Sequence, residues 1–241
     1  MAVSRWLGTV SSFVLTAFFA SHGASAQNGS KIGVASAAKN RVDGTVGGTT
    51  RPLSAGSNIF AREVVRTGEQ SSAQLLFLDE TSLSIGPQSE VTLDRFVFDP
   101  NRGAGNVVVN VSRGALRFVS GSQQSSSYQI KTPVATIGVR GTLFQVYVTF
   151  AASGQPVVYL LWVEGTGPVN YAGKTINMGP GQGLVLTNSG IQGPFAWPWS
   201  AHLTDMRGQL LDLAQIPDSA ADLRDQLFGT GGPPPDVGYG N

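Results

Sequence analysis

The chain alternates short apolar runs with turn-forming residues from Gly33 to about Gly193, and this alternation constrains the fold more than any other feature. Runs of Val, Leu, Ile, Phe and Thr are separated by clusters of Gly, Pro, Asn, Asp and Ser. Such a pattern is typical of many brief strands joined by turns, and no long helical period interrupts it. The sequence therefore predicts an all-β domain of about a dozen strands, either β-solenoid-like or a sandwich.

Individual runs differ in how many of their faces are apolar. In Ser72–Leu78 apolar residues fall on both faces, which predicts a central strand buried on both sides. In the next run Val107, Val109 and Val111 share one face, with Asn110 and Ser112 opposite, so one side of this strand should be exposed to solvent. The same reasoning places Arg117 on the solvent-exposed side of the run 116–118.

The first 26 residues are typical of a targeting segment. Arg5 is followed by a mostly apolar stretch that ends at Ala20, and Ala24–Ala26 has the small-residue spacing that a signal peptidase accepts. The sequence predicts a signal peptide over residues 1–26 and export to the periplasm or the cell exterior. No later stretch is apolar enough for a bilayer, so no membrane span is expected after cleavage.

Charge and cysteine content narrow the possible functions. The chain has 16 Lys and Arg residues against 15 Asp and Glu, and no basic run, so a nucleic-acid partner is not expected. It has no cysteine, which excludes a disulfide framework and a lipidated cysteine. With two histidines in the whole chain, a zinc site is not expected either.

The pattern changes at residue 194, after which apolar residues recur at helical spacing: Leu203, Met206, Leu210 and Leu213. We expect a short helical segment over residues 194–229, followed by a disordered tail over 230–241, which is rich in Gly and Pro. The apolar stripe has two interpretations. It packs on its own domain, or it docks on a partner, and the sequence leaves both open.

Residues able to do chemistry are few and scattered. His202 lies in the expected helical segment without a nucleophile motif. Asp79, Glu80, Glu90 and Asp94 could supply a glycosidase pair, but adjacent strand residues face opposite ways and such acids are common in turns. The sequence therefore predicts no catalytic residue, no cofactor and no metal ligand.

Three stretches stand out by their order and spacing: Arg62–Leu83, which contains Val64-Val65-Arg66-Thr67-Gly68 and Leu78-Asp79-Glu80-Thr81; Arg113–Phe118; and Thr132–Val146, which contains Ile137-Gly138-Val139-Arg140-Gly141-Thr142. Together they resemble the FecR family over about residues 60–150. Residues 163–165 and 179–182 resemble the downstream continuation of the pattern. We expect a FecR-like β domain over residues 27–193.

The signature of this resemblance comprises Gly114, Thr132, Pro133, Arg140, Gly141 and Thr142. Glycine tolerates positive φ, and a guanidinium can bond the carbonyls of adjacent turns, so structural roles are favoured over ligand contacts. Glu80 stands where the family often has glycine, which leaves the local turn type open.

The resemblance implies an extracytoplasmic β module that contacts proteins. Family regulators carry a sigma-binding segment and a membrane span before this domain, whereas an export signal precedes it here, so anti-sigma activity is not expected. We expect a non-enzymatic module for protein–protein interaction or sensing in the cell envelope, with an envelope or secreted protein as partner. The alternative is a glycan- or surface-binding adhesin-like module in which Tyr128, Tyr159, Trp162 and Tyr171 stack on sugars. A hydrolase is a distant third.

Overall fold

A computed structural model describes residues 29–99 and 105–196, and these residues confirm the all-β prediction. They form fifteen strands, somewhat more than expected, and one short 3₁₀ turn. The strands are β1 Lys31–Lys39, β2 Val42–Val46, β3 Thr49–Pro52, β4 Asn58–Phe60, β5 Val64–Thr67, β6 Ser72–Phe77, β7 Ser82–Ile85, β8 Glu90–Val97, β9 Asn106–Val119, β10 Tyr128–Lys131, β11 Thr136–Phe150, β12 Pro156–Tyr171, β13 Lys174–Met178, β14 Gln182–Thr187 and β15 Gly190–Ala196.

The ends of the chain were also the subject of predictions. The expected signal peptide, the tail over 230–241 and the helical segment from residue 197 onward lie outside the described residues. Residues 194–196, which the sequence assigned to the helical segment, complete strand β15. No helix in the described part of the chain is long and apolar enough to cross a membrane.

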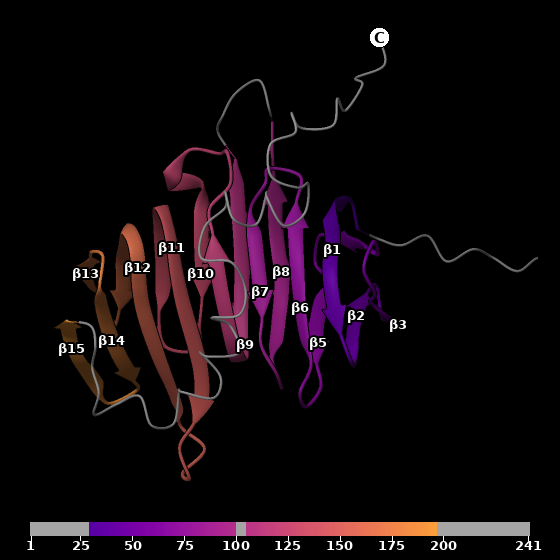
Figure 1. Ribbon diagram of the computed structural model, residues 1–241. Helices are drawn as coiled ribbons and strands as arrows, with labels where there is room; N and C mark the ends of the chain where they lie inside the picture. Colours follow the sequence, from indigo (N-terminus) through magenta and orange to yellow (C-terminus); the bar gives the residue numbers. More distant parts are fainter. Residues whose placement is uncertain (1–28, 100–104, 197–241) are drawn as a thin grey trace, which may run out of the picture.

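The strands form two layers that share three members (Figure 1). The first layer has the order β4-β1-β6-β7-β9-β11-β12-β14-β15. The second has the order β3-β2-β5-β8-β9-β10-β11-β12-β13. The long strands β9, β11 and β12 belong to the first layer over one half and to the second over the other. They therefore tie the layers together through the backbone itself.

Both arrangements that the sequence left open describe part of this fold. The chain advances from one end of the row of strands to the other and alternates between layers, as in a solenoid (Figure 1). The pairing is antiparallel except between β9 and β10, and the two layers face each other, as in a sandwich.

Aromatic side chains join the two layers in the core. Phe77 of β6 meets Phe96 of β8 with ring centroids 5.5 Å apart, and Phe118 of β9 meets Tyr128 of β10 at the same distance. Both pairs have near-perpendicular rings, an arrangement that aromatic quadrupoles favour. Trp162 is fully buried. Burying each such ring contributes on the order of 2 kcal/mol, so one apolar core serves both layers.

Strand β6 corrects one prediction in part. It is central, because it pairs with β1 on one side and β7 on the other. However, only the face with Ala73, Leu75 and Phe77 is buried in the core, and its other face is half-exposed. Leu78 follows the strand and is 54% exposed. The apolar residues on the second face of this run therefore lie at the surface.

Strand β9 confirms the predicted solvent-exposed side of its first half in part. Val107, Val109 and Val111 are buried, and on the opposite face Ser112 is exposed and Asn110 partly exposed, but Val108 is buried. Arg117 is only 1% exposed, so the expected wet side of the run 116–118 is wrong. Its neighbours across the sheet, Ser84 and Gln145, are buried as well. Ala115 and Val119, which lie on the same face of β9 as Arg117, are buried in small apolar clusters.

Candidate functional site

Gly114 lies where β9 passes from the second layer to the first. Up to Arg113 the strand pairs with β8, and from Gly114 onward it pairs with β11. The glycine has φ +88°, and a Cβ there would stand 2.5 Å from the Cα of Ser89. The Ser89 hydroxyl accepts a hydrogen bond from the Ala115 N–H at 3.1 Å. The crossing therefore requires glycine for its φ and for the close approach of Ser89.

The Arg140-Gly141-Thr142 triplet occupies the equivalent position in β11. Arg140 pairs with Thr166 and Leu143 with Glu164, both on β12, and the register shifts between these two pairs. β11 contacts β10 before this point and β9 after it. Arg140 is exposed. Two of the three signature stretches thus coincide with the places where long strands change layer.

Thr132 and Pro133 form the turn that joins β10 to β11. The Thr132 hydroxyl accepts a hydrogen bond from the Ala135 N–H and donates one to the Ala135 carbonyl, both at 3.1 Å. The Thr132 N–H donates to the same carbonyl at 2.9 Å. Pro133 is exposed at the tip. This turn sets the register of β11 as it enters the second layer.

Asp79 is the centre of a buried polar network that sequence reasoning assigned to a simple turn. Its Oδ2 accepts hydrogen bonds from Gln123 Nε2 at 2.6 Å, the Thr81 hydroxyl at 2.9 Å and the Tyr128 hydroxyl at 3.2 Å. Its carbonyl also accepts from the Ser122 N–H at 2.8 Å. Burial, together with the charge of Asp79, raises the pKa of Tyr128 to about 12. The network fastens the β6–β7 turn to the segment before β10.

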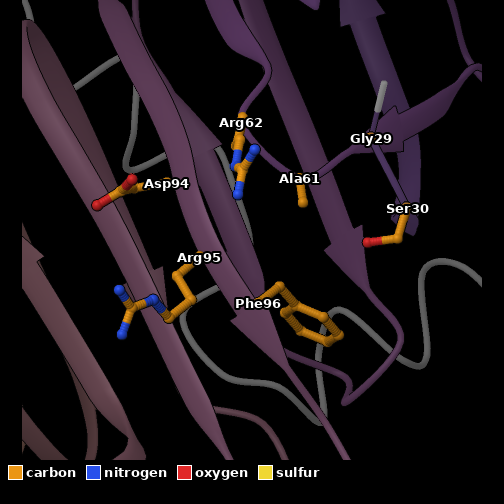
Figure 2. Close-up of a pocket in the computed structure, with 7 residues that line it drawn as sticks. All are labelled: Gly29, Ser30, Ala61, Arg62, Asp94, Arg95 and Phe96. Carbon is orange, nitrogen blue, oxygen red and sulfur yellow. The ribbon is translucent and has the colours of Figure 1, made fainter. Parts of the chain in front are cut away.

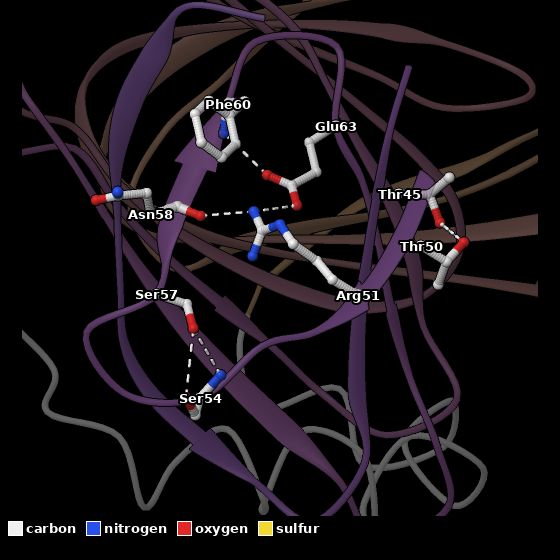
Figure 3. A network of polar contacts seen from close by, with 8 residues as sticks. All are labelled: Thr45, Thr50, Arg51, Ser54, Ser57, Asn58, Phe60 and Glu63. Atoms are coloured by element: carbon white, nitrogen blue, oxygen red, sulfur yellow. Dashed lines mark hydrogen bonds and ion pairs between the residues drawn. The ribbon is translucent and has the colours of Figure 1, made fainter. Parts of the chain in front are cut away.

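A second polar network ties the layers at the N-terminal end (Figure 3). Buried Glu63 accepts hydrogen bonds from Arg51 Nη2 at 2.8 Å and from the Phe60 N–H at 2.9 Å. Arg51 also donates to the Asn58 carbonyl at 2.7 Å and lies over the Phe60 ring. Burial raises the pKa of Glu63 against the opposing effects of the Phe60 N–H and Arg51. These contacts join β3 of the second layer to β4 of the first.

The four acids considered for hydrolysis lie in different surroundings. Asp79 is buried in its own network, and Glu80 is exposed beside it. Glu90 forms an ion pair with Arg66 at 2.9 Å, and Asp94 lies 3.9 Å from Lys131. Over the described ranges, no group of three or more acids and histidines could hold a metal ion. His202 lies outside those ranges.

The aromatic residues considered for sugar stacking do not share a surface. Tyr128 and Trp162 are buried in the core. Tyr171 donates its hydroxyl hydrogen to the Thr187 carbonyl at 2.7 Å, and Tyr159 is half-buried against Tyr147. Two of the four rings are therefore unavailable to a glycan.

A polar pocket of about 410 Å³ opens near the first described residues (Figure 2). Its lining comes from the start of the described chain, the segment before β5 and strand β8: Gly29, Ser30, Ala61, Arg62, Asp94, Arg95 and Phe96. Arg62 has φ +66°, and Arg95 follows a register shift in β8. Both guanidinium groups are exposed, so the pocket suits a polar ligand, but it holds no nucleophile paired with a base.

The crossings, the turn and the Asp79 network all fall in a segment that known proteins share. Residues 63–162 match the sequence model of the family described as FecR protein. This match confirms the resemblance for that segment, and it runs from buried Glu63 to buried Trp162.

Comparison with solved structures found two crystal structures of a "putative anti-sigma factor" from Parabacteroides distasonis ATCC 8503, at 1.65 and 2.50 Å resolution. Each is 14% identical to this chain, with a TM-score of 0.42 over 54% of this chain and 57% of the other. The chain thus spans little more than half the length of those proteins. A search of curated proteins found no match.

Proposed function

We propose that this chain is an exported, non-enzymatic FecR-type module that binds another protein in the cell envelope and serves sensing or regulation there. The FecR domain match over residues 63–162 is the observation that carries this proposal. The signal-like sequence of residues 1–26 supports the export step.

The use of polar groups supports a binding role over catalysis. Asp79 and Glu63 are buried and held by several donors each, and their partners lie on neighbouring strands or turns. Such networks fix the geometry of the domain, and both carboxylates serve in them as buried hydrogen-bond acceptors. The surface offers single apolar side chains such as Val97 and Phe150, which can contribute to a protein contact.

Export is tested by fractionating cells that produce the C-terminally tagged full chain. We expect the protein in the periplasmic or culture fraction, with Gln27 as its first residue. A control with Arg5 and Trp6 changed to Glu should stay in the cytoplasm with its N-terminus intact. If the unchanged chain also stays in the cytoplasm uncleaved, the envelope setting is wrong.

Partner binding is tested by capture from envelope extract with the tagged mature protein, followed by reverse capture with each protein identified. A variant deleted from Ala201 onward is carried in parallel. We expect one saturable protein partner that also retrieves this chain in the reverse experiment. Binding to purified cell wall or polysaccharide without any protein partner would reject the proposal in favour of a glycan binder.

A further inference from the structure

The outside of the first layer carries an apolar surface that we call the outer patch, formed by Ala115, Tyr147, Tyr159, Leu161 and Val185. These residues lie on β9, β11, β12 and β14, which are neighbours in the first layer. The residues that alternate with them belong to the core between the layers. Because side chains alternate along a strand, the outer patch faces away from the core.

The centre of the outer patch is buried although it lies on the outside. Ala115 is 0%, Val185 6% and Leu161 7% exposed. Among the described residues, every member of this cluster lies on the first layer. The fifteen described strands all belong to the two layers, so none of them forms a third layer over the outer patch. By contrast, the outward residues Ser112 and Arg95 on the second layer are exposed. A sheet face with this composition and burial is typical of one that another element covers.

The chain itself leads to this patch. Strand β15 is the edge strand of the first layer, and its last residues run beside β14. Phe195 packs against the outer patch, one residue before the described chain ends at Ala196. The residues that follow in the sequence therefore start at the margin of the patch.

The dimensions of the expected helix and of the patch agree. From Ala115 on β9 to Phe195 on β15, the outer patch and its margin span five strands, which corresponds to about 19 Å at the usual strand spacing. A helix over residues 201–215 would be about 22 Å long. Its apolar stripe of Leu203, Met206, Leu210 and Leu213 matches a flat apolar surface of that width.

We propose that residues 197–229 pack across the outer patch of their own chain, with the stripe of Leu203, Met206, Leu210 and Leu213 against it. Covalent attachment gives the segment an effective concentration on the order of millimolar at the patch, which favours it over a second copy. The proposal goes beyond the proposed function, since it concerns contacts within the chain and holds whether or not an envelope partner binds. While the segment is in place, a partner has to use another surface.

Engineered cysteine pairs in the full chain test this docking, because the natural sequence has no cysteine. The test pair is Leu161→Cys with Leu210→Cys, and the control pair is Val97→Cys with Leu210→Cys. Val97 is exposed on β8, which belongs to the second layer. After oxidation at low protein concentration, we expect the intramolecular product of the test pair to exceed that of the control by about tenfold. Tyr159→Cys replaces Leu161→Cys if the latter fails to fold.

Equal yields from the two pairs, or no product from either, would overturn the proposal. A cross-linked dimer from the test pair would overturn it in favour of a second copy as the cover.

A second measurement uses charge on the expected helix. Leu210→Asp with Leu213→Asp should release the segment and raise the fluorescence of an added hydrophobic dye about threefold or more. Thr204→Asp with Gln215→Asp adds the same charge on the opposite helical face and should leave the fluorescence unchanged. An equal rise in both variants, or no rise in the first, would contradict the docking. Neither readout depends on an envelope partner, so their failure is separable from failure of the proposed function.

Discussion

Replacing Gly114 with alanine should destabilise the domain by about 2–5 kcal/mol. Its φ of +88° costs an L-residue roughly 1–2 kcal/mol. The added Cβ would stand 2.5 Å from the Cα of Ser89, and relief of that overlap costs about 1–3 kcal/mol more. Because the obstacle includes backbone, rotation of the Ser89 side chain cannot remove it. The shift would also disturb the hydrogen bond between the Ala115 N–H and the Ser89 hydroxyl.

Gly154→Ala is the matched control. Gly154 has φ +79°, yet nothing lies within 4 Å of the position of its Cβ. It should lose only the conformational part, about 1–2 kcal/mol. Urea unfolding of both variants, followed by circular dichroism, gives the two losses from the shift in midpoint at constant slope. Equal losses in the two variants would refute the assignment of Gly114 to a close crossing of strands.

Three further predictions concern the β6–β7 turn and its network. Asp79→Ala should cost about 3–5 kcal/mol in urea unfolding, because it leaves several buried donors without an acceptor; a loss below about 1 kcal/mol would argue against the network. The pKa of Tyr128 is higher in the folded state, at about 12, than the ordinary value of 10, so its contribution is complete below pH 10 and is lost as the pH rises to about 12. Between pH 10 and 12 the free energy of unfolding should fall less steeply with pH in Tyr128→Phe than in the unchanged protein. Equal slopes of the two pH profiles would contradict the raised pKa of Tyr128. Glu80 is exposed at φ +68°, so Glu80→Gly should raise stability by about 0.5–1 kcal/mol, measured by thermal unfolding, whereas a decrease would contradict the strain.

The sequence was sufficient for the fold class because the period of two is a local signal. Val107, Val109 and Val111 are buried as their alternation predicts. Burial on the outer side is not local, since it depends on what packs over a sheet. For that reason the sequence wrongly predicted a solvent-exposed Arg117. It also predicted a buried second face for β6, which is half-exposed.

In the candidate site, too, local features could be predicted from the sequence and long-range contacts could not. The motifs themselves could be found by their spacing, and Gly114 and Arg140 proved to lie where strands change layer. The role of Asp79 could not be predicted, because its partners Gln123 and Tyr128 are 44 and 49 residues away along the chain. Nothing in the local sequence of a turn identifies donors at that distance. Glu80 is an opposite case, because here the sequence did point to a backbone feature. The family often has glycine at this position, and the turn has a positive φ.

The order of the strands has a mechanical consequence. β1 and β4 lie at one end of the row and β15 at the other, so a pull between the two ends of the described chain acts across the strands (Figure 1). Hydrogen bonds between strands run in that same direction, and they would be loaded a few at a time from the ends inward. Only at β9, β11 and β12 does opening one layer also require the other to open. The domain should therefore unzip readily at its margins under tension and resist at its centre.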